Sequence, residues 1–200
     1  RLEALFNYQT LITELTGLPV ANASLLDEGT AAAEAMLLAH SQSKKKDFIV
    51  DDKIFPQTLE VLQTRARPLG INIVKVDLDK LVDLESLEKA FGVIIQYPNN
   101  HGALKYHDGF LRCAEAYKCM KIAIVDPLCQ VLMKPVGEMG FDVAVGSMQR
   151  FGVPMGFGGP HAAFFATTDK YKRKIPGRIV GQSVDAQGNK ALRLALQTRE

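Results

Sequence analysis

Short apolar runs alternate with helix-like segments through most of the chain, and this alternation constrains the fold more than any other feature. The runs Val93-Ile94-Ile95 and Ile122-Ala123-Ile124-Val125 contain no polar residue, which is typical of parallel strands covered by helices on both sides. Parallel strands need long crossover connections, and these are usually helices. The sequence therefore predicts an α/β fold with three layers, α/β/α, around a mostly parallel mixed sheet.

The expected elements follow one another in regular order. Strands are predicted at 48–50, 71–76, 93–96, 122–125, 141–145 and 162–166. Helices are predicted at 2–15, 27–39, 56–66, 84–91 and 110–120. The last two strands leave no room for a long helix between them, so the final strand is expected to run antiparallel at or near the sheet edge.

The bulk properties indicate one globular domain over residues 1–200. The chain is 47% hydrophobic and shows no repeat or linker, so one large core is expected. Its net charge of +2 gives no reason to expect a nucleic-acid or membrane partner, and no apolar run has transmembrane length. The chain opens at Arg1 inside a predicted helix and stops abruptly after 197–200. We therefore expect a piece of a longer polypeptide, truncated at both ends.

The cysteines and histidines do not form a recognisable metal or disulfide pattern. Cys113, Cys119 and Cys129 are odd in number and lack zinc or redox spacing. They are expected to pack as small apolar side chains in a reducing compartment. The four histidines are scattered along the chain, so no metal site is predicted.

Candidate site residues follow the predicted strands, because open α/β sheets bind ligands at the carboxyl ends of their strands. Gly29 and Thr30 open a predicted helix, where backbone N–H groups can either bind a phosphate or be satisfied by ordinary capping. Asp126 directly follows a strand and precedes Pro127. Its carboxylate could keep a cofactor's pyridinium nitrogen protonated or could simply start a turn.

Ser147 and Gln149 follow the predicted strand 141–145. Their placement resembles that of the cofactor lysine in aspartate-aminotransferase-like enzymes. An imine to pyridoxal phosphate needs a nucleophilic amine, and the amide of Gln149 has only a delocalised lone pair. The position therefore matches a cofactor-lysine segment, but the residue does not.

A glycine-rich loop comes next and contains Gly156, Gly158, Gly159, Pro160 and His161. Such a loop brings backbone close to a ligand or to a neighbouring subunit, and the sequence leaves both options open. It has neither dinucleotide-binding nor phosphate-loop spacing, which disfavours dehydrogenase and kinase chemistry. The basic cluster 170–174 is interpreted as a solvated helix surface, with an acidic partner protein as the alternative.

Long stretches of the chain resemble the amino-terminal half of the glycine cleavage system P-protein family. The most specific stretches are Arg1–Thr10, Ala21–Glu28, Ala31–Met36, Gln149–Phe165 and Arg193–Glu200. The chain departs from the family pattern at two positions: Gly29 stands where alanine is expected, and Phe55 where histidine is expected.

The resemblance implies a pyridoxal-phosphate-dependent glycine decarboxylase made of two related halves. Each half would contain the large domain of the aspartate-aminotransferase-like fold, packed as a pseudo-dimer within one chain or as two subunits. Only the carboxyl-terminal half would carry the lysine and bind pyridoxal phosphate, so no cofactor is expected on this chain. The enzyme would release carbon dioxide from glycine and pass the aminomethyl group to the lipoyl arm of the H-protein.

On this reading no residue here is catalytic, and Gly29, Thr30, Asp126, Ser147 and Gln149 mark a vestigial cofactor site. The loop from Gly156 to His161 would support the active site of the other half. Two alternatives stay open. One is a structural module that docks the catalytic half or the H-protein, and the other is an independent pyridoxal-phosphate enzyme that uses a lysine outside this chain. A bacterial cytoplasm is expected, or the mitochondrial matrix if the source is eukaryotic.

Overall fold

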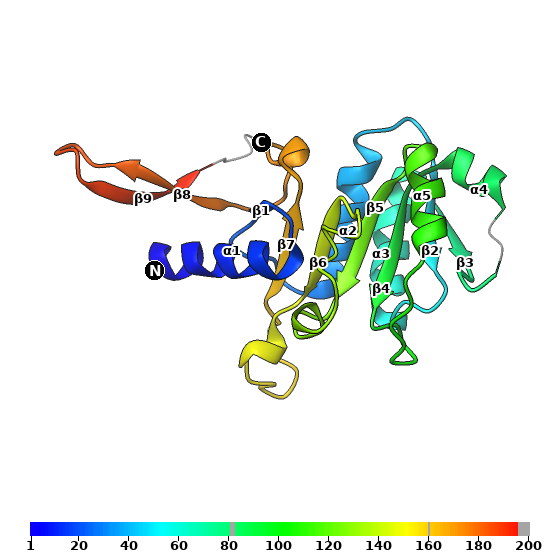
Figure 1. The fold of residues 1–200 in the computed structure, drawn as a ribbon, viewed down its shortest axis with the longest axis horizontal. Helices are drawn as coiled ribbons and strands as arrows, with labels where there is room; N and C mark the ends of the chain where they lie inside the picture. The colour runs from blue at the N-terminus through cyan, green and yellow to red at the C-terminus, as the bar shows by residue number, and fades with distance from the viewer. Residues whose placement is uncertain (81–82, 160, 196–200) are drawn as a thin grey trace.

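A computed structural model describes residues 1–80, 83–159 and 161–195. Its centre is a seven-stranded sheet with the order β1-β7-β6-β5-β4-β2-β3 (Figure 1). The strands are β1 (Val20–Ala21), β2 (Asp47–Asp51), β3 (Asn72–Val76), β4 (Ala90–Tyr97), β5 (Met120–Val125), β6 (Val143–Ser147) and β7 (Ala163–Thr167). Strands β2 to β6 pair in parallel, and β7 runs antiparallel between β6 and the short edge strand β1. The predicted antiparallel strand near the edge is confirmed.

Helices cover both faces of the sheet. They are α1 (Leu2–Thr16), α2 (Glu28–His40), α3 (Pro56–Ala66), α4 (Leu84–Lys89) and α5 (Asp108–Ala116). Short 3-10 turns are η1 (Arg67–Leu69), η2 (Cys129–Val131), η3 (Gln149–Phe151) and η4 (Asp169–Tyr171). Along β5, Ile122 and Ile124 join the core under α2 and α3, while Ala123 and Val125 join the core under α1 and α5. Because both faces of β5 are buried, its residues from Ile122 to Val125 are apolar without interruption, and the one charged residue of the strand, Lys121, pairs with Glu115. The predicted three-layer fold is confirmed.

Local signals set several boundaries as expected. Gly17 ends α1 in the left-handed conformation, with φ of 67°, which glycine adopts without a steric penalty. Asp27 caps α2, and its Oδ1 accepts a 2.7 Å hydrogen bond from the Thr30 N–H. Pro56 occupies the first turn of α3, where its missing N–H costs nothing.

Several predicted boundaries are wrong by two or more residues: β4 begins at Ala90 instead of residue 93, and α5 and β5 each begin two residues earlier than predicted. Helix α5 ends at Ala116 instead of residue 120, because Lys118 adopts a positive φ of 59° and the chain turns into β5 at Met120. Helix α4 ends at Lys89 instead of residue 91, since the next residues already belong to β4. Strand β6 begins at Val143 instead of residue 141. Phe141 is buried outside the strand and packs against Tyr97, with the two ring centroids 5.9 Å apart.

A second, two-stranded sheet is absent from the prediction. Strands β8 (Ile179–Val184) and β9 (Lys190–Ala195) form an antiparallel hairpin that projects away from the main body (Figure 1). Its base is fixed to α1, because the buried Gln9 amide donates to Val180 O at 3.0 Å and accepts from Val180 N at 2.7 Å. An isolated hairpin is only marginally stable in water, so this attachment holds the base of the hairpin against the body.

The basic residues of the cluster 170–174 are exposed, as predicted, but they lie on a 3-10 turn and the residues after it instead of on an α-helix. Residues Asp169–Tyr171 form the 3-10 turn η4, and Tyr171 is buried in the core. Lys174 donates to the side-chain oxygen of Gln42 at 2.6 Å. This hydrogen bond joins the end of the cluster to the turn that follows α2.

In the part of the chain that the structure describes, every helix is too short or too polar to cross a lipid bilayer.

Candidate functional site

Two adjoining cavities open at the carboxyl ends of β2, β4, β5 and β6. The chain moves outward from β2 to β3 and then returns to place β4 on the other side of β2, and ligands of open α/β sheets bind near such a reversal. The larger cavity, of about 430 Å³, is lined by Asp27, Glu28, Gly29, Phe55, Gln57, Thr58, Val61, Ser147, Gln149 and His161. The smaller, of about 270 Å³, is lined by Glu28, Phe55, Gln96, Tyr97, Pro98, Asp126, Pro127, Ser147, Gln149 and Arg150. We call the two together the cleft.

The structure brings four of the five predicted vestigial-site residues into the cleft. Gly29 lines the larger cavity, Asp126 lines the smaller one, and Ser147 and Gln149 lie between them. Thr30 lines neither cavity, and its N–H is used by the cap on Asp27. Neither cavity has a lysine among its described lining residues.

The glycine-rich loop meets the cleft only at its end. His161 lines the larger cavity, whereas Gly156, Gly158 and Gly159 line neither. Pro160 lies outside the described residues. Gly156 and Gly158 have positive φ values of 52° and 87°, which turn the loop outward from the sheet edge (Figure 1).

Large apolar side chains of this loop are exposed. Met155 is 77% exposed, and Phe157 is fully exposed while holding a positive φ of 55°. Leu132, after β5, is 88% exposed, and Val131 is 65% exposed. Large apolar side chains exposed close together on one loop, as Met155 and Phe157 are, are typical of a surface that another part of a protein covers.

Asp126 makes a turn and an ion pair at the same time. Its Oδ1 accepts a 2.9 Å hydrogen bond from Leu128 N, and its Oδ2 lies 3.0 Å from Arg150 Nη1. The turn that the sequence offered as one reading is confirmed. The carboxylate that the other reading assigned to a pyridinium nitrogen is paired with the guanidinium of Arg150 in this structure.

Glu28, which the sequence analysis did not single out, lies between the two cavities. Its Oε1 accepts a 3.4 Å hydrogen bond from Gln96 Nε2, and Gln96 Oε1 accepts a 2.8 Å bond from Phe55 N. Burial raises the pKa of Glu28 to about 7, with nearby Asp126 and Asp27 adding to the rise and hydrogen bonds from Ser147 and Thr58 opposing it. The signal missed in the sequence is a carboxylate at the first residue of a helix next to the cap Asp27.

We expect Glu28→Gln to stabilise the protein at alkaline pH. The folded state binds the Glu28 proton more tightly than the unfolded state, so the contribution of Glu28 to stability falls as pH rises from 4.5 to about 7. The substitution removes this loss and should raise the free energy of unfolding at pH 8 by up to about 3 kcal/mol, with little change at pH 4. Urea unfolding of wild type and variant at both pH values measures the difference.

Glu88→Gln, on the exposed face of α4, is the matched control and should change stability by less than about 0.5 kcal/mol at either pH. An equal effect of Glu28→Gln at pH 4 and pH 8 would contradict the burial argument.

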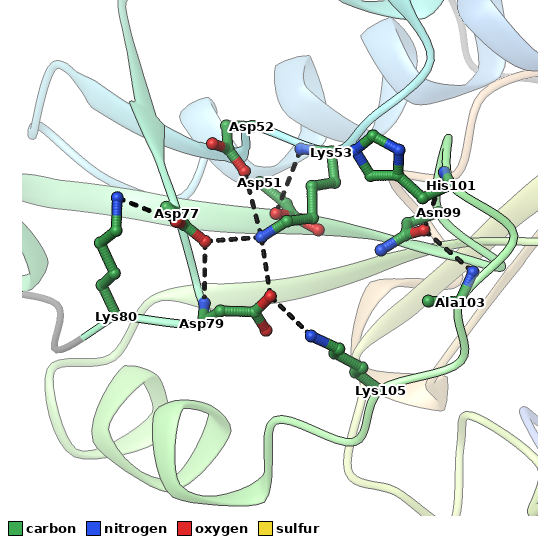
Figure 2. A network of polar contacts seen from close by, with 10 residues as sticks. All are labelled: Asp51, Asp52, Lys53, Asp77, Asp79, Lys80, Asn99, His101, Ala103 and Lys105. Atoms are coloured by element: carbon green, nitrogen blue, oxygen red, sulfur yellow. Dashed lines mark hydrogen bonds and ion pairs between the residues drawn. The ribbon is translucent and has the colours of Figure 1, made fainter.

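An ionic network stands beside the cleft, at the ends of β2 and β3 (Figure 2). Lys53 Nζ lies 2.5 Å from Asp77 Oδ1 and 3.0 Å from Asp79 Oδ2. Lys105 Nζ also reaches Asp79, at 2.7 Å. These pairs raise the pKa of Lys53 and lower that of Asp77. The network joins the loops that follow β2, β3 and β4.

The same network fixes the loop that carries Phe55 into the cleft. Asp51, at the end of β2, accepts from Lys53 N at 3.3 Å, and burial raises its pKa to about 6. Asn100 N donates to Lys53 O at 2.9 Å, and Asn99 Oδ1 holds the following turn through Ala103 N at 3.0 Å (Figure 2). The loop after β2, which carries Phe55, is therefore hydrogen-bonded to the loop after β4 and ion-paired with the loop after β3.

The whole chain matches one family. The family model described as glycine cleavage system P-protein covers residues 1–200. The chain belongs to the glycine cleavage system P-protein family. It is 59% identical over 203 residues to the glycine dehydrogenase (decarboxylating) of Prochlorococcus marinus, covering 100% of this chain and 21% of that protein. The protein of the same description from Nostoc punctiforme is 55% identical over 202 residues, and the match covers 100% of this chain and 20% of that protein.

Solved structures agree with this assignment. A crystal structure of glycine decarboxylase (P-protein) of the glycine cleavage system in inhibitor-bound form superposes with a TM-score of 0.92 and 38% identity, covering 99% of this chain and 46% of that one. An aromatic-amino-acid aminotransferase from Burkholderia pseudomallei, covalently bound to pyridoxal phosphate, superposes with a TM-score of 0.59 at 12% identity. The match covers 81% of this chain and 48% of that one. The second likeness concerns the fold alone, and it confirms the predicted aminotransferase-like fold.

The cleft residues do not fit pyridoxal phosphate. Gln149 offers no amine for an imine. Asp126 is already paired with Arg150, and carboxylates of Asp27 and Glu28 stand at the start of α2. Above pH 7, the approximate pKa of Glu28, the cofactor's phosphate would meet these carboxylates where a helix N-terminus normally attracts an anion.

Proposed function

We propose that this chain belongs to the supporting half of a pyridoxal-phosphate-dependent glycine decarboxylase, and that the catalytic lysine and cofactor lie elsewhere in the enzyme. The observation that carries the proposal is Gln149, two residues after the end of β6, in a cleft that has no lysine among its described lining residues. The family supports the reaction: glycine loses its carboxyl group as carbon dioxide, and the aminomethyl group passes to the lipoyl arm of the H-protein.

The chain spans about a fifth of the length of its curated relatives, since it covers 21% of the Prochlorococcus protein. The remaining length leaves room for a second, catalytic half with its own lysine. Pyridoxal phosphate on that half would accept the electrons that decarboxylation frees. In this proposal none of the residues described above takes part in a bond-making step.

In this proposal the chain forms part of the wall of the catalytic site. Enzymes with sites between domains can use side chains from both. The exposed Met155 and Phe157 would pack against the catalytic half, and His161 would hold the end of the loop at the cleft. A covered loop of this kind excludes water and fixes the position of the neighbouring backbone.

A docking role without any contact to the site is the second candidate. It is favoured by one observation, which is that Gly156, Gly158 and Gly159 line neither cavity. Under both candidates the partners are the catalytic half and the lipoylated H-protein, and glycine is the substrate. The bacterial relatives favour the cytoplasm as the place of action.

Release of labelled carbon dioxide from carboxyl-labelled glycine by the full-length protein tests the proposed reaction. We expect release only when both pyridoxal phosphate and lipoylated H-protein are present. Equal release without H-protein, or none with both components, would contradict the assignment.

A further inference from the structure

We infer that the two carboxylates at the start of α2, Asp27 and Glu28, and the Arg150–Asp126 pair exclude a phosphate-bearing pyridine cofactor from this cleft, independently of the missing lysine. The inference rests on the proposed function, because it explains why this half is silent. It adds that restoring the lysine alone does not restore the site. Glu28 is then a specificity-determining residue.

The first step concerns the phosphate end of the cleft. Helix α2 begins at the larger cavity, and the free N–H groups of a helix start normally attract an anion. Here the Thr30 N–H is already bound to Asp27 Oδ1 at 2.7 Å. The Glu28 carboxyl adds a second acidic group at the same place. At pH 8, above the pKa of Glu28, a phosphate dianion in the larger cavity would face the carboxylates of Asp27 and Glu28 together, in a partly buried site where such repulsion is weakly screened.

The second step concerns the positive charges that could offset this repulsion. Arg150 is the one arginine among the described residues that line the cleft, and its Nη1 lies 3.0 Å from Asp126 Oδ2. It lines the smaller cavity, away from the start of α2, whose residues line the larger one. The guanidinium is thus engaged with a carboxylate, and His161 is the one basic side chain among the described residues that line the larger cavity with Asp27 and Glu28.

The third step concerns the ring end. A carboxylate that holds a pyridinium proton needs a free oxygen lone pair directed at the ring nitrogen. In this cleft Asp126 Oδ1 accepts from Leu128 N at 2.9 Å, and Oδ2 is paired with Arg150. A ring nitrogen would have to share this carboxylate with the guanidinium, whose positive charge opposes protonation of the ring. Both ends of the cofactor are therefore disfavoured, whatever residue stands at position 149.

The test introduces the lysine and then removes the acidic groups. Full-length variants Gln149→Lys, Gln149→Lys/Glu28→Gln and Gln149→Lys/Asp27→Asn/Glu28→Gln are incubated with pyridoxal phosphate at pH 8, where Glu28 is ionised in the wild type. Asparagine keeps the capping ability of residue 27. A lysine amine at position 149 condenses with the aldehyde to a C=N bond with loss of water, and borohydride reduces that bond by hydride transfer. Peptide mapping by mass spectrometry then gives the pyridoxyl occupancy at position 149.

We expect the double and triple variants to show at least about tenfold higher occupancy at position 149 than Gln149→Lys alone. The matched control is Gln149→Lys/Glu88→Gln, which removes one carboxylate far from the cleft and should stay at the level of the single variant. Thermal unfolding of every variant checks that each is folded. If the triple variant is not folded, the double variant alone is compared with Gln149→Lys.

Full occupancy in Gln149→Lys alone would overturn the inference, and so would occupancy that stays low in both the folded double and the folded triple variant. The proposed function has a separate readout in the same experiment. Wild-type protein carrying a pyridoxyl group within residues 1–200 would overturn the proposed function, whatever the variants do.

Discussion

Gly146→Ala should lower the free energy of unfolding by about 3 kcal/mol or more, which is one of the largest effects expected of any single methyl group in this chain. Gly146 lies in β6, between β5 and β7. A Cβ at this position would lie 2.1 Å from Val125 O and 2.7 Å from Phe164 Cε1. Because Val125 O belongs to the strand backbone, the contact cannot be relieved by a side-chain rotation. Strand β6 would have to move, and the cleft residues that follow it would move as well.

Urea unfolding of the full-length protein measures this effect, with Gly109→Ala as the control. Gly109 lies in α5 with open space around its Cβ position, and alanine there should be neutral or stabilising by roughly 0.5–1 kcal/mol. Equal stability changes in the two variants would mean that β6 is not packed as described.

Phe157→Asp is expected to lower glycine decarboxylation by the full-length protein at least about 30-fold. Phe157 is fully exposed on the glycine-rich loop, next to the exposed Met155. If the catalytic half covers this loop, the substitution places a charge in a desolvated contact, where burial of an unpaired carboxylate is strongly unfavourable. The loss should show in the release of labelled carbon dioxide and in kcat/KM for glycine.

Leu69→Asp is the matched control, because Leu69 is also exposed, at 50%, but lies in η1 after α3, away from the cleft lining. Its activity should stay within about threefold of wild type, since isolated exposed apolar residues are ordinary on protein surfaces. Equal activity in wild type and Phe157→Asp would contradict a covered loop.

The sequence was sufficient to predict the central sheet, for a physical reason. Strands β4 and β5 are buried on both faces, so their central residues, 92–95 and 122–125, are apolar without interruption, and the polar Gln96 and Lys121 lie toward the strand ends. Helix α3 was predicted to the residue, because Pro56 marks its first turn. In these elements the local sequence signals and the burial in the fold favour the same secondary structure. Such segments can be predicted from the sequence alone.

The hairpin of β8 and β9 was missed because its residues carry weak signals. Gly181, Gln182 and Ser183 favour no strand, and the attachment to the body depends on Gln9, which is 171 positions from Val180. The turn at Asp185, which accepts from Asn189 N at 2.8 Å, was the available local signal.

The site was predicted in part for a similar reason. The residues that follow β5 and β6 could be placed in one cleft, because parallel strands end at the same sheet edge. The Arg150–Asp126 pair could not, since it depends on β5 and β6 being neighbours. Glu28 was missed because its position in the cleft depends on Gln96 and Ser147, which belong to other strands.

The most direct test of the central claim is the location of pyridoxal phosphate in the wild-type, full-length protein. Borohydride reduction fixes the cofactor to its lysine, and peptide mapping then identifies that lysine. We predict a single labelled peptide that lies outside residues 1–200. A pyridoxyl group on Lys134, or on any other lysine of this chain, would contradict the account.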